Sequence, residues 1–209
     1  MISFQELLTS FDIAMIFGIV AIGIYVTFRT INFADLTCDG SFVTGAAVSA
    51  VLIKSGVDPY IATIASLVSG GLAGLLTGIL NVKFKIADLL AGIIVAFMLY
   101  SVNLRIMNDA PSMVIIDSVT VFTNSNVSIT IISLVLLFAL AVICLLFSSF
   151  GLKLRSVGHN KQFSSIAGIN IQLMTIAGVV ISNSLVALGG GLLSQYQGFC
   201  DNPRELVHW

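Results

Sequence analysis

Asp35 and Asp39 stand four residues apart in INFADLTCDGSFVTGAAVSA, residues 31–50, inside a chain that carries few other charges. A charge at the centre of a membrane helix costs at least about 2.5 kcal/mol, so such side chains face protein or a water-filled cavity. Two interpretations remain open. Asp39 caps the following helix and Gly40 permits a turn in a loop at the membrane surface. Alternatively, the segment is a discontinuous helix whose polar break lines a transport path.

Motifs of the common catalytic sites are absent from the sequence. It contains no H-E-x-x-H, no G-x-S-x-G and no Walker-type glycine loop, and its histidines are His159 in a basic stretch and His208 near the end. An intramembrane aspartyl protease needs two aspartates on facing helices, whereas Asp35 and Asp39 lie on one segment. We therefore predict that the chain is not an enzyme.

The composition indicates a membrane protein. Of the 209 residues 57% are hydrophobic and only 9% are charged, and the mean hydropathy is +1.07. A soluble domain carries about 25% charged residues. We predict an all-α, polytopic bundle of transmembrane helices, and the lack of a basic surface argues against nucleic-acid binding. The first twelve residues contain no Lys or Arg, so we expect the first span to be retained rather than cleaved as a signal peptide.

Apolar windows of the length that a bilayer requires predict about six crossings. Five are clear, and a sixth run is short, at about 12 residues, and crosses only if the polar stretch before it continues the helix within protein. The six predicted segments are Ile13–Phe28, the short Phe42–Ile53, Tyr60–Leu80, Ala87–Val102, Ile129–Phe147 and Ile171–Leu188.

The basic residues then divide unequally between the two sides of the membrane. One side carries Arg29, Lys83, Lys85, Lys153, Arg155 and Lys161, and the other carries Lys54, Arg105 and Arg204. The positive-inside rule makes the first side cytoplasmic. The N-terminus and the polar loop at 103–128 are therefore expected outside.

Small residues suggest two further features. Gly70, Gly74 and Gly78 recur at four-residue intervals, a spacing that lets helices approach closely, either inside the bundle or at a subunit interface. The run 189–191 is three successive glycines, each of which weakens a helix by about 1 kcal/mol, so we predict a helix break there. The three cysteines, Cys38, Cys144 and Cys200, lack C-x-x-C spacing and are predicted to be small core residues rather than metal ligands or redox groups.

Three longer stretches resemble a known family. They are TFRTINFADLTCDGSFVTGAAVSAVLI, KFKIADLLAGIIVAFMLYSVNLRIM and LRSVGHNKQFSSIAGIN. They are similar to the membrane-spanning permease subunit of bacterial ABC importers of the branched-chain amino acid and ribose type, closest to the tryptophan- or tyrosine-type subgroup. The resemblance runs from about Ile13 to Asp201, and its specific motifs are D-L-T-x-D-G-S-F and Y-S-x-N-L-R-I-M.

This resemblance implies a function and a set of partners. The chain is expected to form the translocation path for a small, amino acid-like solute in the bacterial cytoplasmic (inner) membrane. It would work with cytoplasmic ABC ATPase subunits, an extracytoplasmic substrate-binding protein and a second permease copy. It would bind no cofactor itself, since the partner ATPase uses the ATP. A secondary ion-coupled transporter and a non-transporting membrane assembly protein are the alternatives.

The resemblance also implies candidate site residues. Asn32, Asp35, Asp39 and Asn103 are candidates for the translocation path or its gate, and we expect the two aspartates to fix the broken segment through hydrogen bonds and to pair with bases such as Arg29. Residues 159–167 are expected to form a short coupling helix that docks into the ATPase. The residues assigned to it are Gly158, His159, Asn160, Lys161, Phe163, Ile166 and Gly168.

The sequence of this loop agrees with such a role. Phe163, Ile166 and Ala167 have the i, i+3, i+4 spacing of one helical face, and Gly158 and Gly168 would provide flexible ends. In the alternative, Phe163 packs on the permease's own helices. We assign residues 1–201 to a transmembrane permease domain that is incomplete relative to the family. Residues 202–209 form a polar tail, an atypical ending that is too short to cross the membrane.

Overall fold

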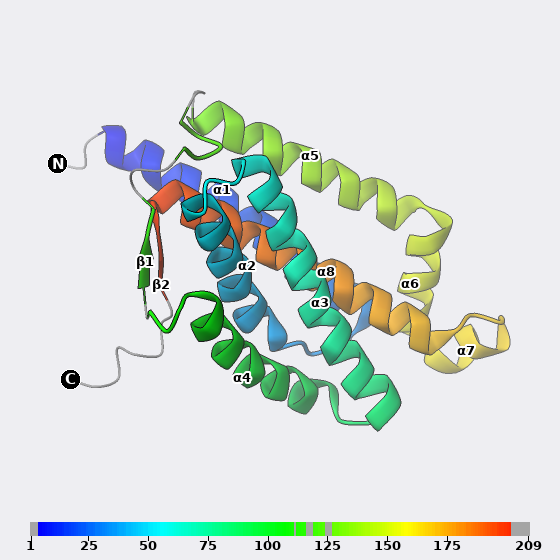
Figure 1. The fold of residues 1–209 in the computed structure, drawn as a ribbon. Coiled ribbons are helices and arrows are strands. Elements are labelled where there is room, and N and C mark those ends of the chain that lie inside the picture. The colour runs from blue at the N-terminus through cyan, green and yellow to red at the C-terminus, as the bar shows by residue number, and fades with distance from the viewer. Residues whose placement is uncertain (1–3, 111, 116–118, 124–126, 202–209) are drawn as a thin grey trace.

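A computed structural model describes residues 4–110, 112–115, 119–123 and 127–201 (Figure 1). The described residues are mostly helical, which confirms the all-α prediction. The elements in chain order are α1 (Phe4–Tyr25), the π-helical η1 (Val26–Ile31), α2 (Thr37–Lys54), α3 (Pro59–Phe84), α4 (Asp88–Ile106), β1 (Ser112–Val114), α5 (Val127–Phe147), α6 (Ser149–His159), α7 (Lys161–Ile166), α8 (Ile171–Gln197) and β2 (Phe199–Asp201). The two short strands pair antiparallel, with Met113 opposite Cys200.

Five helical segments in the described part of the chain are long and apolar enough to cross a membrane. They are α1 with η1, α3, α4, α5 and α8. The sixth predicted crossing corresponds to α2, which has 18 residues and begins at Thr37. The polar stretch before Phe42 does continue the helix, as the short apolar run requires. Within the bundle Thr37 and Ser41 are buried and hydrogen-bonded, whereas Asp39 is exposed.

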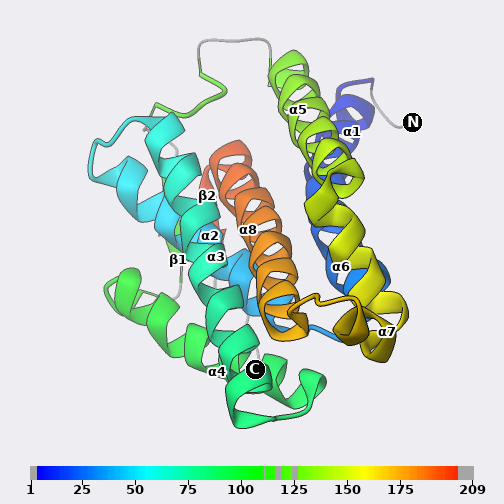
Figure 2. The same cartoon turned by 90° about the vertical axis from the view of Figure 1, so that its right-hand side faces the viewer.

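Helix α8 lies at the centre of the bundle (Figures 1 and 2), where it contacts α1, α2 and α3. In the most apolar stretch of α8, 67% of the residues are buried, compared with 17% in the corresponding stretch of α5. Helix α5 packs along α1 and stands apart from α3 and α4 (Figure 2). Most of the α5 surface is therefore available to lipid.

The predicted helix break at residues 189–191 is wrong. Helix α8 runs without interruption from Ile171 to Gln197. The glycines serve close packing instead: a Cβ at Gly190 would overlap the carbonyl oxygen of Phe42, and a Cβ at Gly191 would overlap Ser66. Small residues permit this approach, and the packing offsets their low helix propensity.

The glycines of α3 have the same role. A Cβ at Gly70 would overlap the backbone of Asn183, and a Cβ at Gly74 would overlap the carbonyl oxygen of Val179, both on α8. Of the two interpretations of this four-residue spacing, the structure supports packing inside the bundle.

The cysteine prediction is correct for two of the three residues. Cys38 and Cys200 are buried, but Cys144 is exposed on α5. In lipid a small apolar side chain gains nothing from facing the protein, so composition alone does not distinguish the two environments. The described residues contain no group of three or more His, Cys, Asp or Glu side chains that could hold a metal ion.

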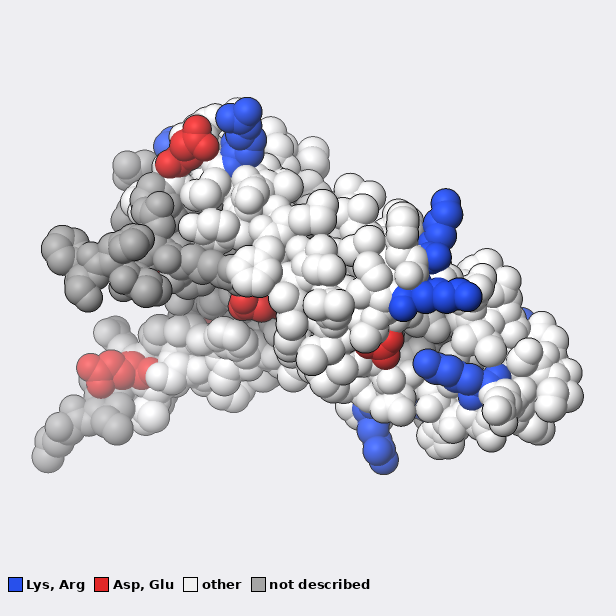
Figure 3. All heavy atoms as spheres, turned by 90° about the horizontal axis from the view of Figure 1, so that it is seen from below, with Lys and Arg blue, Asp and Glu red and all other residues white. Residues whose placement is uncertain are grey.

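The basic side chains are unevenly distributed over the molecular surface. In the view of Figure 3, most of the visible Lys and Arg residues gather toward the end of the molecule that carries α6 and α7. This end also contains the α1–α2 and α3–α4 connections (Figure 2). The arrangement agrees with the division of charge on which the predicted topology depends.

Candidate functional site

The chain is not helical between α1 and α2, at the polar stretch that the sequence singled out. The π-helical turn η1 ends at Asn32, which adopts the left-handed conformation with φ of 53°. Asparagine tolerates this conformation better than most residues, so it suits a helix end. The Asn32 side chain is exposed, and residues 32–36 are extended or irregular before α2 begins.

Asp35 is the buried centre of this break and is 1% exposed. Its Oδ1 atom accepts a hydrogen bond of 2.8 Å from the backbone N–H of Thr37, in the first turn of α2. Its Oδ2 atom accepts a hydrogen bond of 2.6 Å from Nδ2 of Asn183 on α8, and the Cys38 thiol lies 3.8 Å from the same oxygen. Asp35 therefore satisfies one backbone donor at the start of α2 and ties this start to the central helix.

The predicted cap at Asp39 is wrong, since Asp39 lies inside the first turn of α2 and is exposed. Gly40 is also helical, and a Cβ there would press on Ala96 and Leu99 of α4, so it serves packing rather than a turn. Four residues correspond to about one helical turn, but the break places Asp35 before the helix, which separates the two carboxylates.

A network of hydrogen bonds extends from Asp35 into the bundle. Asn183 Oδ1 accepts from the Ser41 hydroxyl at 2.6 Å, and Asn183 Nδ2 also donates to the carbonyl oxygen of Val179 at 3.0 Å. Beside this network, the hydroxyls of Thr37 and Thr77 lie 2.7 Å apart. A buried polar network whose members are paired favours one arrangement of the helices that it joins. These contacts hold the break against α3 and α8.

The predicted pairing of the aspartates with Arg29 is not found among the described residues. Arg29 is exposed and lines a pocket with Arg155 and His159, whereas the Asp35 side chain is turned to Asn183. The physical reason is the π-helical turn, which places Arg29 on the surface before the chain enters the bundle. The gating role of Asp35, Asp39 and Asn32 remains a prediction.

Asn103 lies in α4 rather than in the polar loop in which the sequence placed it. It is 1% exposed, and its Oδ1 atom has no hydrogen-bond partner among the residues that the structure describes. An orphaned buried acceptor is uncommon in native proteins. Asn103 therefore remains a candidate for the path or its gate.

Sequence reasoning missed the buried amides of Asn183 and Gln195. Gln195 on α8 donates to the hydroxyls of Ser49 and Thr63 at 2.9 and 3.0 Å, and its Oε1 accepts from the backbone N–H of Val121. It joins α8 to α2 and α3 near the end opposite Asp35. The available signal was an amide within an otherwise apolar helix, since polar side chains in membrane helices usually have bonded partners.

The loop before α8 contains the predicted short helix, α7. The Asn160 side chain caps it by accepting from the backbone N–H of Phe163 at 3.0 Å, and Gly168 ends the turn after it with φ of 77°. The hydroxyls of Ser156 and Ser164 lie 2.7 Å apart and hold α7 against α6. These bonds give α7 a fixed orientation.

Helix α7 presents apolar side chains to its surroundings. Phe163 is 64% exposed and Ile166 is 86% exposed. The chain's own helices therefore leave most of the Phe163 side chain uncovered, whereas the alternative interpretation required them to cover it. Lys161, at the start of α7, and His159, at the end of α6, are also exposed.

Gly158 does not provide the flexible end that the sequence suggested. It lies inside α6, where a Cβ would overlap the carbonyl oxygen of Thr30. The missing side chain lets α6 pack on the end of η1. Gly168, by contrast, occupies a turn that favours glycine.

Comparison with known proteins finds a matching family and several similar proteins. The family described as "Branched-chain amino acid transport system / permease component" matches residues 7–205. A tyrosine transport system permease protein of Clostridioides difficile (strain R20291) is 40% identical over 190 residues, which cover 90% of this chain and 64% of that protein. The chain thus spans slightly less than two thirds of that relative's length.

Two further relatives are similar over different extents. An uncharacterized protein of Rickettsia prowazekii (strain Madrid E) is 34% identical over 198 residues, which cover 93% of this chain and 70% of that protein. A nucleoside ABC transporter permease protein of Lactococcus lactis subsp. cremoris (strain MG1363) is 46% identical over 46 residues, 22% of this chain and 14% of that protein. No solved structure matches the chain.

Proposed function

Because the chain belongs to the family of branched-chain amino acid transport system permease components, we propose that it is the membrane-spanning subunit of an ABC importer for a small, amino acid-like solute. The observation that carries this proposal is the family match over residues 7–205. The name of the Clostridioides relative favours tyrosine or a similar aromatic amino acid as the solute. The permease itself is not an enzyme in this proposal; ATP is used by the partner ATPase, and this chain binds no cofactor.

The ATPase subunit docks on α7. An exposed pair of large apolar side chains, Phe163 and Ile166, on a helix too short to enter the membrane suits a groove on a protein partner. The Asn160 cap and the contact between Ser156 and Ser164 make the helix rigid. A rigid element can transmit a displacement from the ATPase to α6 and α8, to which α7 is joined.

The solute does not pass between α2, α3 and α8 in the described conformation. These helices meet through close backbone contacts: a Cβ at Gly45 would overlap the Ala187 backbone, and a Cβ at Gly190 would overlap the Phe42 carbonyl oxygen. We place the path at the interface with a second permease copy, where the exposed Asn32 and Asp39 could line its cytoplasmic end. Asp35 acts from inside, by holding the helix break.

The topology follows from the same assignment. The chain lies in the bacterial inner membrane with its N-terminus outside and with α6 and α7 in the cytoplasm, as the distribution of Lys and Arg favours. An extracytoplasmic binding protein delivers the solute to the opposite end. Impermeant labelling of a cysteine at Ser156 from outside intact cells would contradict this orientation.

The docking of α7 can be tested with matched variants. Phe163→Asp should abolish stimulation of ATP hydrolysis by solute and leave membrane insertion intact, because a charge cannot enter an apolar groove. Tyr60→Asp is the control, since Tyr60 is an aromatic residue of similar exposure, 62%, at the first turn of α3 on the opposite side. Cysteines at Gln162 and in the ATPase groove should also crosslink. Normal stimulation in Phe163→Asp would defeat the docking proposal.

A further inference from the structure

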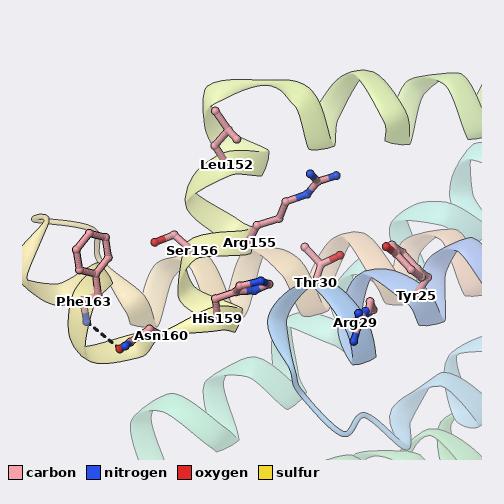
Figure 4. A pocket seen from close by; sticks show the side chains of 9 residues that line it. All are labelled: Tyr25, Arg29, Thr30, Leu152, Arg155, Ser156, His159, Asn160 and Phe163. Atoms are coloured by element: carbon pink, nitrogen blue, oxygen red, sulfur yellow. Dashed lines mark hydrogen bonds between the residues drawn. The ribbon is translucent and has the colours of Figure 1, made fainter.

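A pocket of about 560 Å³ lies where the end of α1 and η1 meets α6 and α7 (Figure 4). Its lining residues are Tyr25, Arg29, Thr30, Leu152, Arg155, Ser156, His159, Asn160 and Phe163. Two of them are arginines, one is a histidine and none is acidic. The pocket therefore favours an anion, and its hydroxyl and amide groups add hydrogen-bonding capacity.

The basic side chains come from segments far apart in the sequence. Arg29 belongs to η1, whereas Arg155 and His159 extend from α6 toward Thr30 and Tyr25 (Figure 4). The Arg155 guanidinium lies 5.5 Å from the centre of the Phe147 ring, an aromatic contact that positions the guanidinium near the end of α5. Guanidinium groups bind phosphate oxygens with good geometry, so the anion that fits best is a phosphate group.

A second, apolar groove of about 370 Å³ begins at the same place. It runs between α1 and α5 and is lined by Ala21, Ile22, Tyr25, Ala139, Val142, Ile143 and Leu146. Tyr25 lines both cavities, so the cationic pocket and the apolar groove adjoin. A tyrosine that separates a polar from an apolar region is typical of the membrane–water interface.

We propose that an anionic phospholipid occupies these two cavities together. Its phosphate and headgroup bind between Arg29, Arg155 and His159, and one acyl chain lies in the groove between α1 and α5. A free phosphate would leave the groove unfilled, and a soluble acidic peptide would have no reason to enter a groove within the membrane. The complementary charge and the adjoining apolar groove thus select a lipid.

The position of this site gives it a role in the assembly. It joins η1, which precedes the helix break, to α6, which carries α7. A bound lipid would bridge these segments and hold α6 at the membrane surface, because its headgroup and chain contact different elements. This inference depends on membrane embedding but not on the transported solute or on ATP.

The test is native mass spectrometry of the full chain released from nanodiscs. The nanodiscs contain both phosphatidylglycerol and phosphatidylcholine, and the lipids that stay bound to the released chain are compared. We expect one phosphatidylglycerol molecule to be retained in preference to phosphatidylcholine. The double variant Arg29→Gln/Arg155→Gln should bind phosphatidylglycerol about 25-fold more weakly, since each basic side chain near an anionic surface contributes about fivefold. Equal retention of the two lipids by the unaltered chain would overturn the proposal.

The matched control is Lys83→Gln/Lys85→Gln. It removes the same charge at the α3–α4 connection, and neither lysine lines the pocket. Phosphatidylglycerol retention should be unchanged in this variant; an equal loss in both double variants would mean general surface attraction and would refute a defined site. A third variant, Ala139→Phe, fills the groove and should weaken phosphatidylglycerol without affecting inorganic phosphate.

Two competing occupants are distinguished by the same experiments. If inorganic phosphate displaces phosphatidylglycerol and Ala139→Phe has no effect, the site binds phosphate and the lipid assignment is wrong. If Arg29→Gln/Arg155→Gln weakens the ATPase subunit but not phosphatidylglycerol, the pocket is a protein-binding surface and the proposal fails.

Discussion

Replacement of Asp35 by alanine tests whether the helix break is held from inside the bundle. The substitution leaves two N–H groups without their acceptor, the backbone N–H of Thr37 and one of the two N–H groups of Asn183 Nδ2. The other Nδ2 bond, to the Val179 carbonyl oxygen, is kept. Each buried donor left unpaired costs about 1–3 kcal/mol, so the free energy of unfolding should fall by about 4 kcal/mol. Asp35→Asn keeps one accepting oxygen and should cost about half as much.

Asp39 provides the internal control. It lies four residues away on the same segment but is exposed, so Asp39→Ala should change the free energy of unfolding by no more than about 0.5 kcal/mol. Unfolding of the purified full chain by sodium dodecyl sulfate in mixed micelles, followed by circular dichroism, measures both. Equal destabilisation by Asp35→Ala and Asp39→Ala would show that the buried hydrogen bonds of Asp35 do not hold the helix break.

Two further predictions concern packing and thiol chemistry. Gly190→Ala should prevent stable folding, because its Cβ would overlap the Phe42 carbonyl oxygen. Gly18→Ala should fold normally, since no atom of the described residues lies within 4 Å of the added Cβ. Size-exclusion profiles of the two variants in detergent would distinguish them, and a normal profile for Gly190→Ala would contradict the packing. Burial, followed by the charge of Asp201, raises the pKa of the Cys200 thiol to about 12. Since the thiolate is the reactive form, iodoacetamide should label folded Cys200 very slowly at pH 8. The labelling rate should rise about tenfold per pH unit toward pH 12, whereas the rate for an unfolded thiol levels off near pH 9. Fast labelling at pH 8, measured by peptide mass spectrometry, would show that Cys200 is accessible as a thiolate.

The membrane architecture could be predicted because it depends on local composition. A bilayer requires about 20 apolar residues per crossing, and the five clear spans satisfy this independently of their neighbours. The short sixth run was predicted to cross only if the polar residues before it continue the helix, and α2 does begin at Thr37. That α2 crosses the membrane remains a prediction, because it is not among the five candidate spans. The charge pattern likewise acts through each loop separately.

The contacts within the bundle could not be predicted in this way. The acceptor for Asn183 is 148 residues away in the chain, and nothing local to Asp35 identifies it. Helix propensity gave a break at the glycine run because propensity counts only local cost, whereas the central position of α8 makes small residues favourable there. Local chemistry likewise assigned Arg29 to the nearest carboxylates, but the structure places it beside Arg155.

The short helix α7 could be predicted from the sequence only in part. Its polar cap at Asn160 and its turn at Gly168 are local signals, and the structure contains both. Its relation to α6 depends on Gly158, whose contact with Thr30 brings two distant segments together. Sequence therefore located the element but misjudged what its first glycine does.

If this chain is the permease of an ATP-driven importer, uptake by proteoliposomes should depend on ATP and on the partner proteins. Vesicles would contain the full chain, the ATPase subunit and the binding protein, and uptake of labelled amino acids would be measured with Mg-ATP and, separately, with a proton or sodium gradient. Uptake should occur only when all three proteins and Mg-ATP are present, and it should be lost in Phe163→Asp but not in Tyr60→Asp. Uptake driven by an ion gradient through this chain alone would contradict ATP-driven import and would favour a secondary transporter.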